Sequence, residues 1–405
     1  MKWLRENGRL SFVVLLVSQL AATMGFTFVL PFTPIYVQEL GVTQAGSAAA
    51  WAGVVNSSTA VTMGLAAPLW GRLGDRVGLK PMLLRATVAG AVVVGLMGLV
   101  ESPWQLLALK TLQGCLTGTV AAATVLVSAT APPERAGERL GTLQMVIFAA
   151  AAGGPFFGGV FADLVGIRAS FGVTATLLAA SAVLIFAWVK EERPAEDEAE
   201  EESPGALGPL PHRRLLPSLL ALFVVQLAIM SAAPALPGFI HTLMEEPVRV
   251  ASLAGWIIAT GALAASLGSV VGGRLAARFG ARRVIIWTLL LAGLSALPQA
   301  EVDSVALLWV LRVVTGLFLG IAVPVANLTI RGTVPSERQG EAFGVAATAT
   351  SAGNAVGPVA GGMLAASFGF GAPFLVPGVC LVVVSLLLWG APLLAVGYRM
   401  ALRHH

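Results

Sequence analysis

The sequence predicts an all-α membrane protein, with twelve transmembrane helices in two six-helix repeats and both termini in the cytoplasm. Of its 405 residues, 57% are hydrophobic and 11% are charged, whereas soluble domains carry roughly 25% charged residues. Apolar runs long enough to cross about 30 Å of hydrocarbon recur along the whole chain. Residues of the first half also recur in the second half at a constant spacing, which indicates an internal repeat.

The apolar runs are predicted to cross the membrane as helices, because a helix satisfies its backbone polar groups within one segment. The first run, Leu10 to Gln38, is too long for the apolar part of a signal peptide, and Pro31 and Pro34 close it without a small-residue cleavage site. It is therefore taken as the first span. The twelve runs begin near residues 10, 48, 82, 104, 141, 170, 215, 250, 284, 304, 342 and 373.

The positions of lysine and arginine predict the orientation of these spans. With a cytoplasmic N-terminus, most of the 25 basic residues fall in cytoplasmic segments, as the positive-inside rule requires. Arg168 and Arg249 are in outer segments, and Lys110 and Arg312 are within spans. We therefore expect a multi-pass protein of the inner cell membrane. Nucleic-acid binding would need the cations on one soluble face, so no nucleic-acid partner is expected.

An acidic segment divides the chain into two halves. Eight acidic residues lie between Glu191 and Glu202, followed by glycine and proline, and such a run repels itself and cannot bury a core. We predict a bundle over residues 1–189, a flexible cytoplasmic linker over 190–214 and a second bundle over 215–405. A regulatory acidic segment is the alternative interpretation of the linker.

The two halves repeat each other in sequence. Because each half has six spans, the repeats share one topology and are related by an axis along the membrane normal, which is typical of transporters that work by rocking two bundles. At an offset of 202, Gly71, Arg72, Leu73, Arg76, Gly78, Lys80, Lys110, Gly114 and Gly118 match Gly273, Arg274, Leu275, Arg278, Gly280, Arg282, Arg312, Gly316 and Gly320. At an offset of 203, Pro132, Glu134, Arg135, Gly141, Gly154, Pro155, Gly158, Gly159 and Phe171 match Pro335, Glu337, Arg338, Gly344, Gly357, Pro358, Gly361, Gly362 and Phe374.

A charged connection, WGRLGDRVGLKP at residues 70–81, separates the second and third apolar runs. It resembles the signature between spans two and three of the major facilitator superfamily, and the resemblance covers the whole chain. The resemblance implies that Asp75 latches the outward-facing state, in one half only, because Ala277 takes its place in the second copy. A basic loop that only sets topology would explain the cations but not Asp75. The latch candidates are Gly71, Arg72, Asp75, Arg76, Gly78 and Lys80.

Two glycine-proline runs, GPFFGG at 154–159 and GVAATATSAGNAVGPVAGG at 344–362, are similar to the antiporter signature of the drug/proton efflux branch of that superfamily. Glycines expose a flat backbone stripe that suits tight helix contact, and proline bends a helix. Packing alone competes with a functional kink as their role. The candidates are Gly141, Gly154, Pro155, Gly158 and Gly159 in the fifth span, and Gly353, Gly357, Pro358, Gly361 and Gly362 in the eleventh.

Proton coupling has no obvious carboxylate in this sequence. A carboxylate that loads and unloads near neutral pH is usually buried, but none of the 21 acidic residues falls near the middle of a predicted span. Glu39, Asp163 and His241, at outer ends, are the titratable candidates, although each could be a solvated helix end. The intramembrane cations Lys110 and Arg312 are further candidates, because a charge there is costly unless it snorkels or finds a partner.

A substrate cavity is expected near the midplane between the halves. Its walls combine aromatic and thioether surface with a few uncharged polar groups, which suits varied amphipathic compounds. Any of these residues could instead pack helix against helix. The candidates are Thr23, Phe26, Thr27, Asn56, Met63, Gln113, Met145, Gln226, Met230, Asn327 and Asn354.

These features predict a transporter that exports hydrophobic or amphipathic drug-like compounds in exchange for protons by alternating access. The chain has no phosphate-binding GxxxxGK[ST] motif and no nucleophile triad, so we expect neither an enzyme nor a cofactor. Cys115 and Cys380 lie far apart in apolar runs and predict neither a disulfide nor a metal site. The expected partners are a small-molecule substrate, protons and membrane lipid, with the chain as a monomer. The alternatives are an uncoupled facilitator or lipid translocator, and a transporter-like receptor.

Overall fold

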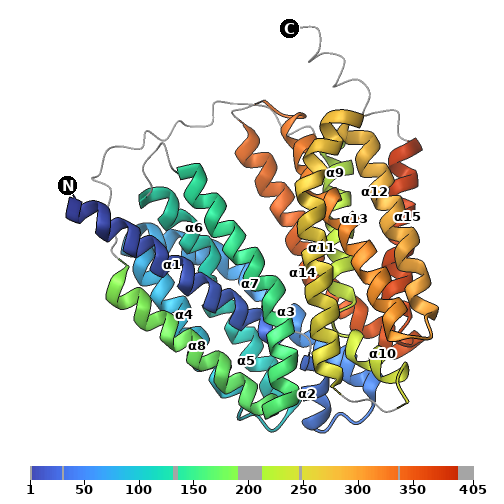
Figure 1. Cartoon of the computed structure of the whole chain (residues 1–405), viewed down its shortest axis with the longest axis horizontal. Coiled ribbons are helices and arrows are strands. Elements are labelled where there is room, and N and C mark those ends of the chain that lie inside the picture. Colours follow the sequence, from blue (N-terminus) through green and yellow to red (C-terminus); the bar gives the residue numbers. More distant parts are fainter. Residues whose placement is uncertain are drawn as a thin grey trace. The chain divides into compact units, whose positions relative to one another are not determined.

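The computed structural model describes residues 2–29, 32–130, 136–189, 212–245, 249–335 and 338–390, and over these residues the chain is helical with no strand (Figure 1). The chain divides into two compact units. Unit 1 comprises Met1–Glu201 and Pro247–Ala259, and unit 2 comprises Glu202–Glu246 and Thr260–His405. Each unit is described by itself.

Unit 1 is built from helices that end at glycines or at polar breaks. Gly78 and Gly166 adopt φ values of 105° and 87° between successive helices, a conformation that favours glycine and stops a helix. The fourth apolar run breaks at Thr117 and Gly118, whose φ is 142°. The helices are α1 (Lys2–Phe28), α2 (Thr33–Glu39), α3 (Ala45–Val77), α4 (Leu79–Met97), α5 (Pro103–Leu116), α6 (Thr119–Thr130), α7 (Ala136–Val165) and α8 (Ile167–Trp188).

Unit 2 follows the same plan. Gly280 and Gly369, with φ of 87° and 89°, separate helices as Gly78 and Gly166 do in unit 1. Ser304 caps α13 by accepting a hydrogen bond from the Leu307 N–H. The elements are α9 (His212–Ser231), α10 (Leu236–Thr242), α11 (Val250–Phe279), α12 (Ala281–Ala296), the 3₁₀ helix η3 (Leu297–Glu301), α13 (Val305–Arg331), α14 (Gln339–Phe368) and α15 (Ala372–Gly390).

Nine of the described helices are long and apolar enough to cross a membrane, so the chain is a multi-pass membrane protein. The helices α3 and α14 and the broken pair α5–α6 are not among the nine. The polar residues 56–59 in the middle of α3, and the many glycines, serines and threonines of α14, lower their hydropathy. A helix lies at, or one residue after, each of the twelve predicted starts, but the number twelve and the cytoplasmic position of the termini stay predictions.

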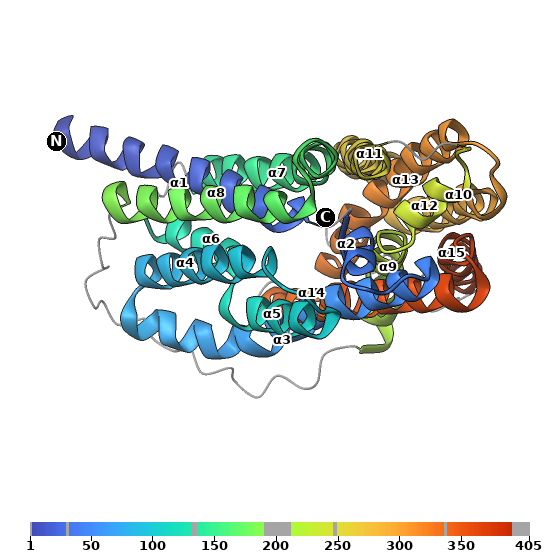
Figure 2. The same cartoon turned by 90° about the horizontal axis from the view of Figure 1, so that it is seen from below.

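The helix packing repeats between the units. In unit 1, α1 packs along α7 and α8, α3 along α5, and α4 along α8 (Figure 2). In unit 2, α9 packs along α14, and α12 along α13 and α15. Buried aromatic residues Phe28, Phe32, Tyr36 and Phe171 centre one core of unit 1, and a second core gathers around Leu83 and Leu143 near α6. Aliphatic residues fill the core of unit 2.

The boundaries of the compact units differ slightly from the predicted bundles. The first turns of α11 group with unit 1 because they pack closely on α7. The helix α9 begins at His212, so the last three residues of the predicted linker are helical. The acidic part of that linker, residues 190–211, lies outside the described residues.

Candidate functional site

The charged stretch at residues 70–81 is mostly helix, which corrects the expectation of a connecting loop. α3 continues through Val77, so Gly78 alone links it to α4, and α11 likewise continues to Phe279 before Gly280. The helix persists because Arg72 and Arg76 are exposed, and long charged side chains reach water while their backbone stays hydrogen-bonded. The charged pattern in the sequence therefore marks a helix end that extends past the apolar run.

The predicted latch is only partly described. Gly71 and Asp75 lie outside the residues whose surroundings the structure describes, so the role of Asp75 as a latch stays a prediction. Beside them, Trp70 anchors the helix end. Its Nε1 donates to the Cys115 carbonyl oxygen at 2.6 Å, and the Arg85 guanidinium lies 3.4 Å from the centroid of its ring.

The last cation of the charged stretch, and its repeat counterpart in unit 2, each contact the C-terminal end of another helix. Lys80 Nζ donates to the Phe186 carbonyl oxygen at 3.1 Å, at the end of α8. Its repeat counterpart Arg282 donates through Nη2 to the carbonyl oxygens of Leu388 and Trp389, at 3.3 and 3.4 Å, at the end of α15. Cations are favourable at helix C-termini, where carbonyl groups lack intrahelical donors. Lys80 therefore contributes to packing inside unit 1, a role that its place in a predicted latch does not suggest.

The glycine-proline run of α7 packs against α1 at backbone distance. A Cβ on Gly158 would collide with the Phe28 carbonyl oxygen, and one on Gly154 would collide with Thr27 Oγ1. Gly159 faces the Ala251 carbonyl in the first turn of α11 in the same way. These glycines are therefore required for close packing within unit 1. Gly141, at the other end of α7, has open space around its Cα.

The second run forms the same contact in unit 2. A Cβ on Gly361 would collide with the Ser231 carbonyl oxygen, and one on Gly357 would press on Met230. We call the close contact between α1 and α7, and that between α9 and α14, a seam. The two seams match at an offset of 203, because Ser231 corresponds to Phe28 and Gly361 corresponds to Gly158. Gly353 also packs on α9, while Gly362 and Pro358 are buried and Gly344 is open. Pro155 and Pro358 lie inside continuous helices, so a functional kink stays a prediction.

Asp163, a predicted coupling candidate, caps a helix. Its Oδ2 accepts a hydrogen bond of 2.8 Å from the Ser252 N–H in the first turn of α11. A carboxylate is stabilising there because the first N–H groups of a helix lack partners and carry partial positive charge. The close approach of Gly159 and Gly255 to opposite backbones brings α7 near enough for this contact.

The two intramembrane cations differ in their surroundings. Lys110 on α5 is buried, with 6% of its surface exposed, and the ion pairs formed by the described residues do not include it. Arg312 on α13 is half-buried, and its guanidinium lies 5.8 Å from the centroid of the Phe374 ring. Lys110 is therefore buried, whereas the other cations of unit 1 whose burial the structure describes are half-buried or exposed. Thr59 and Thr62 hold its helix by donating their hydroxyls to the carbonyl oxygens of Lys110 and Thr111.

Unit 1 contains buried polar atoms without a hydrogen-bond partner among the described residues. They belong to four helices: α1, α3, α4 and α5. Thr23, Asn56 and Gln113 are predicted cavity residues. Ser18 and Gln19 of α1 are not among the predicted residues, because they lie in the middle of a long apolar run. The atoms are Ser18 Oγ, both amide atoms of Gln19, Thr23 Oγ1, Asn56 Nδ2, Arg85 Nε and Nη1, and Gln113 Oε1.

Unit 2 pairs its polar groups more completely. Gln226 Nε2 on α9 donates to Asn354 Oδ1 on α14 at 2.5 Å, which brings two predicted cavity residues together. A second cluster joins Gln299 Nε2 to Thr315 Oγ1 at 2.7 Å and to the Ser295 carbonyl at 3.0 Å. These contacts hold helices together and leave few polar atoms for a ligand.

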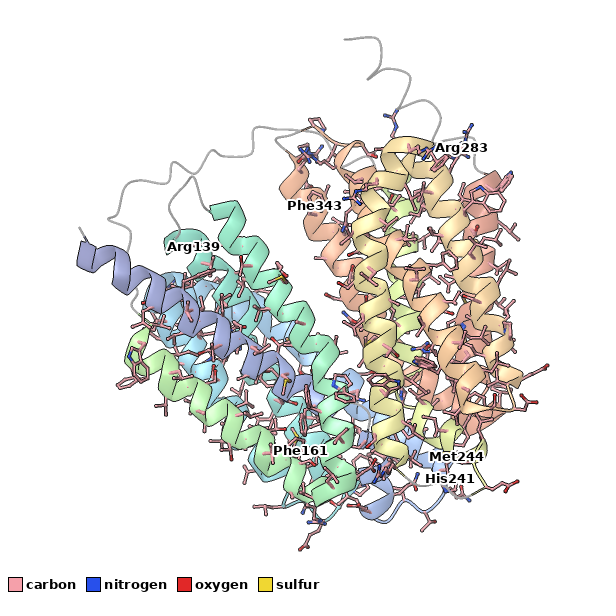
Figure 3. The ribbon with its side chains drawn as sticks, viewed as in Figure 1. Arg139, Phe161, His241, Met244, Arg283 and Phe343 are labelled. Carbon is pink, nitrogen blue, oxygen red and sulfur yellow. The ribbon has the colours of Figure 1, made fainter. Side chains whose placement is uncertain are left out.

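The remaining predicted cavity residues are dispersed. Asn327 lines an open cavity of about 450 Å³ in unit 2 together with Pro324, Arg331 and Phe343. Of these residues, Phe343 is labelled in Figure 3. Phe26 packs into the core of unit 1 against Gly90, and Thr27 Oγ1 donates to the Thr23 carbonyl. Met63 and Met145 are exposed, and Met230 packs on Gly357. Some of these residues therefore lie on accessible surface, while others pack helix against helix.

Glu39, a candidate predicted to lie at an outer end, is the last residue of α2, which follows the candidate membrane span Leu10–Phe28. Partial burial raises the pKa of its carboxyl above the ordinary value, and the nearby Arg168 guanidinium opposes that shift. Arg168 in turn donates to the Gly98 carbonyl oxygen at 3.4 Å. His241 is exposed on α10, at the end of unit 2 opposite Arg283 (Figure 3).

Comparisons with known proteins identify the family of this helical chain. The sequence model of the Major Facilitator Superfamily matches residues 15–247 and 218–395, which together cover most of the chain. The chain belongs to the major facilitator superfamily. It is thus a membrane transporter, and the predicted membership of this superfamily is confirmed.

Curated relatives in this superfamily extend over nearly the whole chain. The multidrug resistance protein MdtG of Dickeya zeae is 33% identical over 366 residues, which are 90% of each chain. MdtG of Proteus mirabilis is 33% identical over 352 residues, 86% of this chain and 88% of that one. Among solved structures, a bacterial homologue of the human lysosomal transporter Spinster superposes with a TM-score of 0.75 at 14% identity, over 97% of this chain and 96% of that one. The nucleoside transporter NupG gives 0.73 at 15% identity, over 93% and 99%.

Proposed function

We propose that this transporter exports hydrophobic or amphipathic drug-like compounds from the cell in exchange for protons, by alternating access. The observation that carries the proposal is the one-third identity to proteins named for multidrug resistance, over nine tenths of both chains. Relatives of this length and identity support drug efflux as the shared activity. The second support is the antiporter-type glycine-proline run, present in both repeats and forming the same seam in each.

The proposed orientation has both termini in the cytoplasm of a cell with an inner membrane. It rests on the distribution of lysine and arginine, most of which then lie on the inner side. In this orientation Arg72, Arg76 and Arg282 are cytoplasmic, whereas Glu39 and His241 are at the outer surface. Labelling of single cysteines at positions 39 and 283 from one side of intact cells tests the orientation, because only the outer position should react with a reagent that does not cross the membrane.

The proposed binding chemistry uses the unpartnered polar atoms of unit 1. Buried amides and hydroxyls that lack protein partners bind water or a ligand, and Gln19, Asn56 and Gln113 offer donors and acceptors without a fixed geometry. The buried ammonium of Lys110 adds one charge. A few polar groups in an otherwise apolar setting suit amphipathic compounds of varied shape.

The proposed coupling uses an outer titratable group. Glu39 is the described carboxylate whose pKa is raised by burial, so it binds a proton at higher pH than an ordinary carboxylate does. A Glu39→Gln variant mimics the protonated state, and Glu101→Gln, an exposed carboxylate on the next outer connection, is its matched control.

The test combines resistance and flux. Expression in a drug-sensitive strain, with cationic, neutral and anionic compounds, should raise tolerance to several amphipathic compounds. In proteoliposomes, substrate flux should rise with an imposed pH gradient, and Glu39→Gln should weaken that dependence while Glu101→Gln should not. Flux that ignores the gradient in the unmodified protein would instead identify an uncoupled facilitator or a lipid translocator. Ligand binding without any flux would identify a receptor.

A further inference from the structure

An open cavity in unit 2 combines two cations with two tryptophans. It has a volume of about 310 Å³ and lies where α12 begins and α15 ends, lined by Arg282, Arg283, Ile286, Trp287 and Trp389. Figure 3 places Arg283 at the end of unit 2 opposite His241 and Met244. None of these five residues belongs to the predicted substrate cavity.

The charge at this cavity favours an anion. Arg282 and Arg283 occupy the first turn of α12, which contains no acidic residue, although cations are unfavourable at a helix N-terminus. Arg282 is directed to the carbonyl oxygens at the end of α15, where a cation is favourable. Arg283 is exposed at the mouth of the cavity. A bound anion would compensate both guanidinium groups and the N-terminal end of the helix together.

The tryptophans give the cavity the character of a membrane interface. The ring centroids of Trp287 and Trp389 lie 5.5 Å apart with the planes at 77°, and each side chain is about half exposed, at 48% and 57%. Tryptophan is enriched at the level of lipid headgroups because its ring is apolar and its N–H is polar. The cavity therefore combines aromatic surface with positive charge.

An exposed apolar strip continues from the cavity along both helices. Leu291 and Leu294 follow Trp287 on α12 after four and seven residues, and on α15 Leu386 precedes Trp389 by three residues and Val383 precedes Leu386 by three. Residues at such spacing share one face of a helix, and α12 and α15 pack against each other. Acyl chains can lie along this strip while a headgroup occupies the cavity, whereas a free phosphate ion would use only the charged end.

The corresponding place in unit 1 lacks this combination. Lys80 matches Arg282 and makes the equivalent contact with the end of α8, so the helix-end contact needs only one cation. Pro81 stands at the position of Arg283, and Arg85 at that of Trp287, where it stacks on Trp70 instead. The second arginine and the tryptophan pair are therefore not required by the repeated fold.

We propose that this cavity binds the phosphate headgroup of an anionic phospholipid, with the acyl chains along the leucine and valine strip. Two guanidinium groups recognise the phosphate, and the tryptophan rings contact the glycerol region. In the orientation proposed above, the lipid belongs to the cytoplasmic leaflet. Basic pockets between transmembrane helices on that side are suited to anionic headgroups.

The experiment measures lipid retained by the purified full-length chain. Native mass spectrometry and melting temperature are recorded in detergent with added phosphatidylglycerol, phosphatidylcholine or inorganic phosphate. We expect phosphatidylglycerol to bind and raise the melting temperature, and phosphatidylcholine to do neither. Arg283→Gln should bind phosphatidylglycerol roughly fivefold more weakly, as expected for one charge at a membrane surface. Arg214→Gln, which removes an exposed arginine of α9, should bind it normally.

Three outcomes would overturn the proposal. The first is equal retention of phosphatidylglycerol and phosphatidylcholine. The second is unchanged binding of phosphatidylglycerol by both Arg283→Gln and Trp287→Leu. The third is stabilisation by inorganic phosphate alone that equals stabilisation by the lipid, which would assign the cavity to a free anion. Because Arg283 is exposed and makes no helix-end contact among those described, its variant should fold, and circular dichroism checks this.

Discussion

The seam between α1 and α7 in unit 1 and the seam between α9 and α14 in unit 2 have the same backbone and different polar chemistry. In both, a glycine of the second helix lies against a carbonyl of the first, at Phe28 and Ser231. In unit 2 the seam also holds the hydrogen bond between Gln226 and Asn354. At the matching positions unit 1 has Thr23 and Ala151, so Thr23 Oγ1 has no partner there.

This difference indicates that the repeat keeps the scaffold and varies the polar groups. A paired amide stabilises a helix contact, whereas an unpaired buried hydroxyl or amide costs about 1–3 kcal/mol unless a ligand or water satisfies it. Gln19 and Gln113 of unit 1 carry that cost. Gln299 Oε1 is an amide oxygen of unit 2 that carries the same cost, within an otherwise paired cluster. We infer that ligand chemistry is concentrated in unit 1 and structural pairing in unit 2.

The largest expected effect tests whether the two seams are equivalent. Gly158→Leu and Gly361→Leu each place a side chain against a carbonyl oxygen of the facing helix, and overpacking against backbone should cost about 3 kcal/mol or more. Both variants should lower the melting temperature and the monodisperse yield to a similar degree. Gly141→Ala and Gly344→Ala, at open positions of the same helices, should change neither. A severe loss in one half only would show that the seams are not equivalent.

The second largest expected effect concerns the hydrogen bond between Gln226 and Asn354 in unit 2. Gln226→Leu leaves the Asn354 amide unpaired in unit 2 and should destabilise the protein by about 1–3 kcal/mol. Adding Asn354→Leu should recover much of that loss, because replacing both partners by apolar groups removes the unsatisfied amide. Melting temperatures of the single and double variants measure the coupling. Additive losses would contradict a direct role for the hydrogen bond seen at 2.5 Å.

The complementary change in unit 1 should act on transport and not on stability. Gln19→Leu and Gln113→Leu remove amides that have unpartnered atoms, so the melting temperature should stay the same or rise. If these amides bind substrate, export should fall about tenfold, which corresponds to roughly 1.4 kcal/mol. Flux in proteoliposomes at matched protein content measures the effect. A loss of stability with normal flux would place these residues in the scaffold and remove the contrast between the units.

Much of this organisation could be predicted from the sequence, because apolar runs and glycine spacing are local signals. The paired glycines of α7 and α14 were found by matching the halves, and their packing role follows from small residues at helical spacing. The helical state of residues 71–77 was missed because charge was taken as a sign of a loop. The partners of Lys80 and Asp163 lie 106 and 89 residues away, and only the folded chain brings them together.

Gln19 shows a different limit of sequence analysis. A single polar residue in an apolar run is usually satisfied by a neighbour or by water, and nothing in the local pattern of Gln19 shows that its amide lacks a partner. Comparing the halves offers a signal, because Leu222 stands at its repeat position. When one repeat has a polar residue where the other has an apolar one, and both repeats pack alike, the shared fold does not require the polar side chain.

The smallest expected effect concerns the helix cap at Asp163, which has no counterpart in unit 2 because Ala366 occupies the repeat position. Asp163→Ala removes the acceptor for the Ser252 N–H and should cost about 1 kcal/mol. Asp163→Asn keeps an oxygen acceptor without the charge and should cost less. If Asp163 acts only as a cap, both variants should retain the response of flux to a pH gradient, and melting temperature should rank them as Asp, Asn, Ala. A pH response lost in Asp163→Asn, at normal stability, would return this residue to the coupling candidates and give unit 1 a second chemical role that unit 2 lacks.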